Sequence, residues 1–578
     1  MTRWYSSRVT LVLAAFFATG MQLQPAPIVA QTPAPASRPV AKRSWPLTRP
    51  EASGFAETSR YDDVIAFMKA MAAASPRIHL TTYGYTYEGR PMPLAVIGAP
   101  GASPEQVKAT KKTRIYIQGN IHAGEVEGKE ALLWLLRSIA KGERNAWLDS
   151  VVLLVNPIYN ADGNERVTVA NRGSQFGPVG GMGQRENAQG LDLNRDGSKL
   201  ETAEARSMAS LLTRYDPHVA MDLHTTDGSA NSGFNMTYET SLNPNDSKAT
   251  SSLLRDVLLP TVTVAAKEKH GESWFYYGGV SGTGDSRAWR SDAELAKPRY
   301  TSTYFGVRNR LGILTETYSY ASFEDRIKNT YWFLEESLGW IAKNGATVRK
   351  AVAAAEAESI IGSQLSVRQE LVRAPDLRSI VFAPTVSERN PYVADRPYRR
   401  RVPGGETTEM LPFYGTTMPT ETSLAPRAWI VPNARGLEAA QPVGGGRGGQ
   451  GGSPTARLIA SVADRLESHG IRYTRTASEL QVTGEQFRIA TNTTADRDYQ
   501  GTHRMRTLTG AWEATTQTLP IGSLIIPMDQ PLARLAFVLF DPRSDDGFMS
   551  WNILDAVLGA APTPGLYPVL RTMETVGH

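Results

Sequence analysis

Residues 113–140 read TRIYIQGN, IHAGEVEG and KEALLWLLRSIA in direct succession. The first segment is rich in β-branched and aromatic residues and predicts a β-strand, and the last has the apolar spacing of an amphipathic α-helix. The middle segment contains His122 and Glu125, and side chains three positions apart on one turn can reach a common point. On its own, this pair indicates either two metal ligands or a polar corner between a strand and a helix.

The same alternation of strand and helix continues along the chain. Short apolar runs occur at residues 150–157, 218–225 and 311–317, and helix-like segments such as residues 203–215 lie between them. Strands that alternate with helices in this way predict an α/β fold, with a mixed, largely parallel central sheet flanked by helices.

Composition limits the possible classes of function. With 578 residues, of which 41% are apolar, the chain can bury more than one core. The net charge of +5 comes from 62 basic and 57 acidic residues that are mixed along the chain, so the sequence predicts no nucleic-acid partner. The chain has no cysteine, so disulfides and thiol nucleophiles are excluded, and any metal site must use His, Asp and Glu.

The N-terminal segment has the features of an export signal. Residues 1–30 have a basic start, an apolar run and small residues near Ala30. This pattern predicts a cleaved signal peptide and a secreted or periplasmic protein. The apolar run is shorter than the roughly 20 residues that span a bilayer, and no later segment is long and apolar enough, so we expect no membrane span after cleavage.

Changes in composition divide the rest of the chain. We expect a Pro/Ala-rich linker, a main α/β domain, a helical and extended connector and a smaller α+β domain of unknown role, at residues 31–50, 51–345, 346–420 and 421–578. In the last domain we predict one helix and three strands, at residues 456–470, 427–432, 522–529 and 532–541. The glycine-rich run at residues 443–452 lacks the Lys-Ser/Thr of a phosphate-binding loop, so we expect a surface loop there.

Further polar residues lie at the ends of the predicted strands, where the active crevice of an open α/β sheet is found. His224 ends the strand at residues 218–225, and Glu316 lies between two threonines near the end of the strand at residues 311–317. An acid so close to a buried strand is poorly solvated unless it faces a cleft, so we expect a pKa suited to proton transfer. Singly, each residue also has an ordinary structural interpretation.

A larger ordered set emerges when the arginines are included. In chain order it consists of His122, Glu125, Arg185, Asn194, Arg195, His224 and Glu316. This set resembles that of the zinc metallocarboxypeptidases of the carboxypeptidase A type, over about residues 55–340. The α/β domain would then be the catalytic domain, and its fold would be that of the zinc carboxypeptidases.

The resemblance implies a zinc site and a general base. The three protein ligands of one zinc ion per chain would be His122, Glu125 and His224, with a water in the fourth position. Glu316 would take a proton from this metal-activated water and pass it to the leaving amine.

The resemblance also implies the residues that surround the substrate. Arg185 would stabilise the oxyanion, and Asn194 and Arg195 would hold the terminal carboxylate of the substrate. Asp192 would orient the first zinc histidine.

Two departures from the family pattern are visible. The digestive members have an arginine between the first His and Glu, where this chain has Ala123-Gly124. The tyrosine that caps the substrate is not decided by spacing, and four candidates remain open: Tyr276, Tyr277, Tyr300 and Tyr304.

Together, these features predict an exported zinc-dependent carboxypeptidase that acts on peptide or protein C-termini. One alternative is a zinc amidase that acts on cell-wall peptides or N-acyl amino acids. A second alternative is a non-catalytic protein that binds peptide C-termini. The sequence decides neither the preferred C-terminal side chain nor the oligomeric state.

Overall fold

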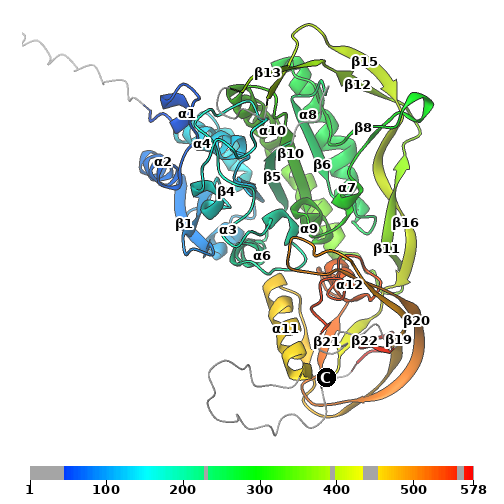
Figure 1. Cartoon of the computed structure of the whole chain (residues 1–578). Helices are drawn as coiled ribbons and strands as arrows, with labels where there is room; N and C mark the ends of the chain where they lie inside the picture. The colour runs from blue at the N-terminus through cyan, green and yellow to red at the C-terminus, as the bar shows by residue number, and fades with distance from the viewer. Residues whose placement is uncertain (1–44, 227–231, 391–396, 434–453, 556–564, 577–578) are drawn as a thin grey trace, which may run out of the picture. The chain divides into compact units, whose positions relative to one another are not determined.

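A computed structural model describes residues 45–226, 232–390, 397–433, 454–555 and 565–576 (Figure 1). The predicted signal peptide at residues 1–30 and the glycine-rich run at residues 443–452 lie outside the described residues, as does most of the linker. All elements below belong to one compact unit that begins at Pro46.

The main sheet has eight strands in the order β1-β2-β4-β3-β5-β10-β6-β7. Their bounds are β1 (Ile78–Tyr85), β2 (Pro91–Ile97), β3 (Thr113–Gly119), β4 (Val151–Asn156), β5 (Val219–Thr225), β6 (Met236–Thr240), β7 (Trp274–Tyr276) and β10 (Leu311–Thr317). The four central neighbours β4, β3, β5 and β10 are parallel to one another, whereas β2 and β6 join them antiparallel. The predicted mixed, largely parallel sheet is therefore confirmed.

Helices flank this sheet because its central strands are apolar on both faces. Every residue of β3, β4 and β5 is buried, as expected for parallel strands covered on both sides. The α-helices of this part are α1 (Arg49–Ala52), α2 (Tyr61–Ala74), α3 (Pro104–Ala109), α4 (Glu127–Ala140), α5 (Ala161–Glu165), α6 (Ala203–Tyr215), α7 (Lys248–Ser252), α8 (Leu259–Ala265), α9 (Thr301–Val307) and α10 (Phe323–Ala357). Helices α4 and α10 pack together against β3, and α9 packs against β5 and β10.

Residues 346–420 are attached to the α/β domain by strand pairing. Strands β11 (Gln364–Arg373) and β16 (Phe413–Leu424) form a four-stranded sheet with β9 (Ala288–Arg290) and β8 (Gly279–Ser281). Two further pairs are β12 (Arg378–Phe382) with β15 (Thr407–Leu411), and β13 (Thr385–Glu388) with β14 (Tyr398–Arg401). Helix α10 continues past residue 345, and its one non-helical residue is Asn344.

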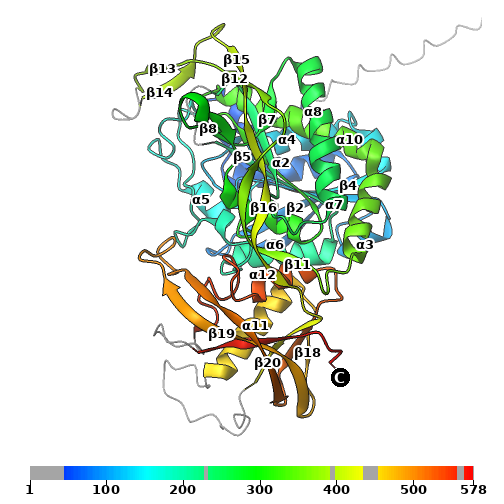
Figure 2. The ribbon, with the colours of Figure 1, turned by 90° about the vertical axis from the view of Figure 1, so that its right-hand side faces the viewer.

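The C-terminal part contains a six-stranded sheet, in the order β18-β21-β17-β22-β19-β20. Its elements are β17 (Ala428–Val431), α11 (Pro454–His469), β18 (Thr474–Arg475), β19 (Leu480–Thr494), β20 (Arg506–Leu519), β21 (Leu524–Pro527), α12 (Ala533–Phe540) and β22 (Leu566–Thr572). Strands β19 and β20 form a long curved pair (Figure 2).

Two of the three strands predicted in this part are confirmed, and the third is wrong. Residues 532–541 form helix α12 and not a strand. All residues from Ala533 to Phe540 are buried, so the run lacks the alternation of polar and apolar residues that separates a strand from a helix. The predicted helix at residues 456–470 is confirmed as α11.

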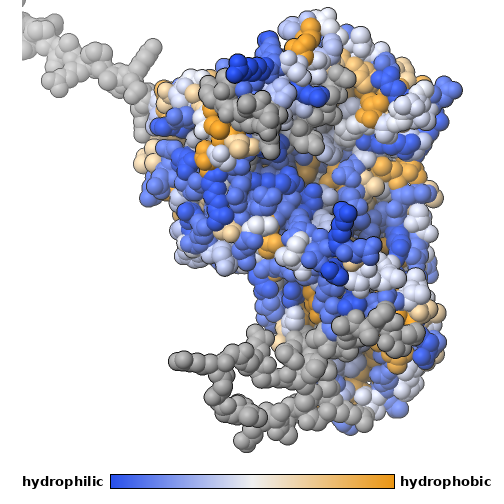
Figure 3. Space-filling model, viewed as in Figure 1, coloured by the Kyte–Doolittle hydropathy of each residue, from blue (hydrophilic) through white to orange (hydrophobic). Residues whose placement is uncertain are grey.

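The surface shown in Figure 3 is mainly hydrophilic, and its hydrophobic residues occur in small separate groups. Within the described residues, no helix is both long enough and apolar enough to cross a membrane.

Close packing of α4 on the sheet depends on glycine. A Cβ atom added at Gly128 would lie 2.6 Å from the Cβ atom of Leu223 on β5, and one at Gly119 would lie 2.9 Å from the backbone of Gly128. The start of α4 can therefore approach the end of β3 and β5 only because these two positions have no side chain. This approach places His122 and Glu125, which lie between Gly119 and Gly128, beside the end of β5.

We predict that Gly128→Ala lowers the free energy of unfolding by about 1–3 kcal/mol, because overpacking has to push α4 away from β5. Gly339→Ala is the matched control, because the nearest atom to a Cβ there is 3.8 Å away, within helix α10. This control is expected to be neutral or to gain about 0.5–1 kcal/mol. Urea unfolding of the two variants makes the comparison, and equal stability of Gly128→Ala and the wild type would contradict the packing argument.

Candidate metal centre and active site

Strand register brings the predicted site residues together. In the parallel pairing of β5 with β10, His224 lies directly beside Glu316. Strand β3 flanks β5 on its other side, and His122 follows the end of β3. The carboxyl ends of three adjacent parallel strands therefore meet at one edge of the sheet, where the active sites of open α/β folds are found.

The three predicted metal ligands converge on one point. His122 Nδ1 lies 2.9 Å from Glu125 Oε1, and His224 Nδ1 lies 2.8 Å from Glu125 Oε2. The two Nδ1 atoms are 3.3 Å apart, and one possible ligand atom from each residue lies within 4.8 Å of the others. All three side chains are buried. Two imidazoles and a carboxylate in this arrangement are a donor set that suits zinc, with one position open for a further ligand.

Each imidazole has a second carboxylate close to its Nε2 atom. His122 Nε2 lies 3.0 Å from Asp192 Oδ1, and His224 Nε2 lies 2.9 Å from Asp222 Oδ2. A carboxylate on Nε2 favours the proton there and leaves the Nδ1 lone pair for a metal. Asp192 was predicted from the sequence, whereas Asp222 was missed. The available signal was spacing, because Asp222 stands two residues before His224, as Asp192 stands two residues before Asn194.

The carboxylate that faces both imidazoles is held in its charged form. Burial alone would raise the pKa of Glu125, but its contacts with His122, Arg172 and His224 hold that pKa well below its usual range. Asp192 behaves in the same way, because His122 and Arg185 outweigh the effect of burial on its pKa. Ionised carboxylates are what a zinc site requires, so the residues present fit the metal.

Glu316 differs from these acids in its surroundings. Burial, together with the negative charge of Glu125 nearby, raises the pKa of Glu316 to about 8. Within the described part of the chain, its Oε2 atom has no hydrogen-bond partner. The side chain thus presents a weakly acidic carboxyl group, with one unpaired oxygen, beside the ligand set.

The predicted arginines and Asn194 line the same cavity as Glu316. Arg185 donates from Nε to Asp192 Oδ2 at 2.9 Å, and its Nη1 atom is 3.6 Å from Glu125 Oε1. The guanidinium of Arg195 stacks on the ring of Tyr300, 4.0 Å from its centroid. Asn194 accepts two hydrogen bonds at Oδ1 from Thr301, at 2.9 Å from its backbone N and 3.0 Å from its hydroxyl. This leaves the Nδ2 amide of Asn194 as the group that can donate to a ligand.

One cavity of about 280 Å³ joins these groups. Six predicted site residues line it, namely His122, Glu125, Arg185, Asn194, Arg195 and Glu316. The cavity therefore combines two of the predicted metal ligands, the acid Glu316 and hydrogen-bond donors that suit an anionic ligand.

Comparison with known proteins gives a family for this part of the chain. Residues 64–301 match the family model described as zinc carboxypeptidase. These residues are similar to the zinc carboxypeptidases, and we refer to this part of the chain as the zinc carboxypeptidase domain. Glu316 lies beyond the matched residues, and the pairing of β10 with β5 places it in the site of this zinc carboxypeptidase domain.

The relatives resemble only part of the chain. Carboxypeptidase 2 of Trichophyton rubrum is 28% identical over 181 residues, which are 31% of this chain and 30% of that protein. Carboxypeptidase D of Mus musculus is 30% identical over 149 residues, which are 22% of this chain and 10% of that protein. The chain thus matches less than a third of the length of either relative.

Solved structures match about half of the chain, at lower sequence identity. A metallo-carboxypeptidase from Burkholderia cenocepacia is 17% identical, with a TM-score of 0.38 over 50% of this chain and 70% of that one. Carboxypeptidase A from Helicoverpa armigera is 15% identical, with a TM-score of 0.36 over 53% of this chain and 76% of that one.

Arg172 is a residue of the zinc carboxypeptidase domain that sequence reasoning missed. Its Nη1 atom donates to Glu125 Oε1 at 3.1 Å, and its Nη2 atom donates to the backbone oxygen of Thr225 at 2.9 Å. A Cβ atom at Gly124 would lie 2.7 Å from Arg172 Cδ, so this glycine makes room for the arginine. The guanidinium beside Glu125 comes from a residue far along the chain, and no short motif could have revealed it.

The structure separates the four tyrosine candidates. Tyr277 and Tyr300 line the cavity of the zinc carboxypeptidase domain. Tyr276 donates its hydroxyl to the backbone oxygen of Arg255, and Tyr304 is fully buried with its hydroxyl 2.8 Å from His469 Nδ1. Only the first two are therefore placed to touch a ligand in this cavity.

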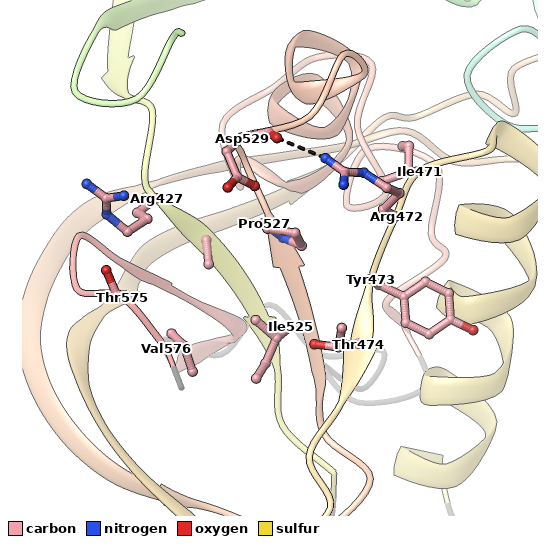
Figure 4. Close-up of a pocket in the computed structure, with 11 residues that line it drawn as sticks. Arg427, Ile471, Arg472, Tyr473, Thr474, Ile525, Pro527, Asp529, Thr575 and Val576 are labelled. Carbon is pink, nitrogen blue, oxygen red and sulfur yellow. Dashed lines mark hydrogen bonds between the residues drawn. The ribbon is translucent and has the colours of Figure 1, made fainter. Parts of the chain in front are cut away.

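A second cavity, of about 620 Å³, lies in the C-terminal sheet (Figure 4). Arg427 and Arg472 are among the residues that line this cavity, and Arg472 donates to the backbone oxygen of Asp529 at 2.9 Å. None of the residues lining this cavity is a histidine, and Asp529 is the one carboxylate among them. This cavity therefore lacks the donor set of the zinc carboxypeptidase domain.

We predict that the purified protein contains one zinc ion, and that chelation lowers its melting temperature until zinc is added back, because a ligand that binds only the folded state stabilises it. His224→Ala should reduce the zinc content to a small fraction of the wild-type value. His79→Gln is the control, because His79 contacts the backbone oxygen of Ala99 and not the ligand set. Metal analysis and thermal melts are the measurements, and full zinc content in His224→Ala would rule out the assigned ligand set.

Proposed function

We propose that this protein is an exported zinc-dependent carboxypeptidase that hydrolyses C-terminal peptide bonds. The observation that carries this proposal is that Glu125, Glu316 and Arg195 all line one cavity. In this cavity, the metal-binding residues and Glu316 would carry out hydrolysis, and the guanidinium of Arg195 would recognise a free carboxylate.

The residues that would hold one zinc ion are His122, Glu125 and His224, with Asp192 and Asp222 orienting the imidazoles. When bound, zinc supplies polarisation of the substrate carbonyl and acidification of the attacking water.

Glu316 is the general base and acid in this proposal. Its unpaired carboxyl oxygen and its position beside His224 allow it to accept a proton from the attacking water. The same carboxyl group then donates that proton to the leaving amine. Proton transfer of this kind by a positioned side chain contributes about 10²–10⁴-fold in rate.

Asn194 and Arg195 bind the terminal carboxylate of the substrate in this proposal. Stacking on Tyr300 fixes the plane of the Arg195 guanidinium, and Thr301 fixes the amide of Asn194. A fixed planar guanidinium suits a carboxylate because two parallel hydrogen bonds can form. Arg185 lies near Glu125 and is placed to stabilise the oxyanion that develops on the scissile carbonyl.

Export belongs to the same proposal. The signal-like segment at residues 1–30 supports a secreted or periplasmic location, although it lies outside the described residues. Peptides and proteins with free C-termini are the proposed substrates.

We predict that Glu316→Gln retains zinc but loses at least about 10²-fold in kcat, because the amide cannot accept the proton of the attacking water. Glu324→Gln is the matched control, because Glu324 lies on the first turn of α10 and pairs with Lys328 on the surface. Metal analysis and a hydrolysis assay on both variants are required. Turnover of Glu316→Gln at the wild-type rate would remove Glu316 from this role.

We predict that peptides with a free C-terminal carboxylate are shortened one residue at a time, whereas the same peptides with a C-terminal amide are not cleaved. The reason is that the amide removes the charge that Arg195 is proposed to bind. Product identification by mass spectrometry over a panel of peptides, cell-wall peptides and N-acyl amino acids makes the test. Hydrolysis restricted to N-acyl amino acids or cell-wall peptides would identify an amidase.

A further inference from the structure

The segment that precedes helix α9 is anchored on the C-terminal part of the chain. Arg299 Nε donates to Asp546 Oδ1 at 2.8 Å, and the backbone N of Arg299 donates to Asp546 Oδ2 at 2.6 Å. Both side chains of this ion pair are only 1% exposed. Arg299 Nη2 also donates to the backbone oxygen of Asp545, at 3.1 Å.

Aromatic residues of the C-terminal part complete this anchor. The guanidinium of Arg299 lies over the rings of Trp551 and Tyr499, at 4.7 Å and 5.1 Å from their centroids. Trp551 Nε1 in turn donates to Asp546 Oδ1 at 3.1 Å. The arginine is thus held in place by charge, hydrogen bonds and stacking from residues beyond 498, and Glu294 Oε2 lies 4.0 Å from its Nη1 atom.

The same Asp546 carboxylate also reaches the segment that follows Arg195. Ser198 Oγ donates to Asp546 Oδ2 at 3.2 Å. The backbone N of Gly197 donates to the backbone oxygen of Arg299 at 3.0 Å, and a Cβ atom at Gly197 would lie 2.4 Å from the backbone oxygen of Pro298. One carboxylate therefore ties together two segments, near residues 198 and 299, that touch closely at a glycine.

These two segments carry the residues proposed to bind the substrate carboxylate. Asn194 and Arg195 stand shortly before Ser198, and Tyr300 directly follows Arg299. Tyr300 lies under the guanidinium of Arg195. The hydrogen bonds between Asn194 and Thr301 join the same two segments on the cavity side.

A second contact fixes α9 itself to the C-terminal part. Tyr304, one turn after Tyr300, has its hydroxyl 2.8 Å from Nδ1 of His469 at the end of α11. Arg308 donates to the backbone oxygen of His469 at 2.8 Å. Helix α9 is therefore also held by the end of α11.

We propose that the C-terminal part is a positioning scaffold for the carboxylate-binding side of the active site, and that Asp546 is the positioning residue through which it acts. This inference rests on the proposed carboxypeptidase function and assigns a role to the C-terminal part. The Asp546 carboxylate holds Arg299 and Ser198, which in turn fix the relative positions of Tyr300 and Arg195. Without it, the guanidinium of Arg299 would remain buried without its partner, and the two segments would shift against each other.

The test compares Asp546→Asn with the wild type in the full-length protein. We expect KM for peptides with a free C-terminus to rise about tenfold, which corresponds to about 1.4 kcal/mol of binding free energy. The zinc content should not change, and kcat should stay within about twofold, because an interaction that is equal in ground and transition states affects KM alone.

A binding measurement separates this inference from the proposed function. In the Glu316→Gln background, calorimetry with an N-acetylated dipeptide that has a free carboxylate should give about tenfold weaker binding when Asp546→Asn is added. The same dipeptide with a C-terminal amide should bind weakly to both proteins. No hydrolysis by the wild type would refute the proposed function, whereas hydrolysis by the wild type with an unchanged KM in Asp546→Asn would refute only the positioning role.

Asp464→Asn is the matched control, because Asp464 of α11 also forms an ion pair with the α/β domain, through Arg206 at 2.7 Å, but away from the cavity. This variant should keep the wild-type KM. If Asp546→Asn does not fold, Ser198→Ala and Arg299→Lys replace it, and Ser198→Ala should raise KM about threefold, the effect of one hydrogen bond. A lower melting temperature with unchanged KM in both replacements would overturn the proposal.

Discussion

The parallel register of β3, β5 and β10 is the constraint on which the rest of the site depends. Because β5 lies between the other two strands, His224 at its carboxyl end stands beside Glu316 on one side and close to His122 on the other. A shift of one residue in the β5–β10 pairing would turn Glu316 away from the cavity, because neighbouring side chains on a strand point to opposite faces. The complete burial of these strands makes such a shift costly.

At the ends of these strands, the site contains buried charged side chains. Burying each of them alone would be unfavourable, and pairing with an opposite charge offsets that cost. Glu125 faces two imidazoles and the guanidinium of Arg172, and Asp192 faces His122 and Arg185. Glu316 is the exception, because burial and the charge of Glu125 raise its pKa by more than His224, Arg172 and Arg185 lower it. Such a contrast between acids in one cavity is typical of sites in which one acid binds a metal and another transfers protons.

Much of the fold could be predicted from the sequence because the central strands are short apolar runs with clear helices between them. The helix α12 was missed because residues 532–541 are apolar except for Arg534 and Asp541, and burial on all sides removes the periodicity that identifies a helix. The clustering of His122, Glu125 and His224 could be predicted because these residues stand at strand ends in a known order. Arg172 and Asp546 could not, because each reaches its partner through contacts between segments far apart in the chain.

The central claim is that two imidazoles and one carboxylate at the strand ends bind zinc through the Nδ1 atoms. Crystallography with anomalous differences at the zinc edge tests it most directly. We predict one peak within about 2.0–2.2 Å of His122 Nδ1, His224 Nδ1 and a carboxylate oxygen of Glu125. The two Nε2 atoms should remain on Asp192 and Asp222. A peak bonded through Nε2, or zinc bound elsewhere with this cluster empty, would contradict the account.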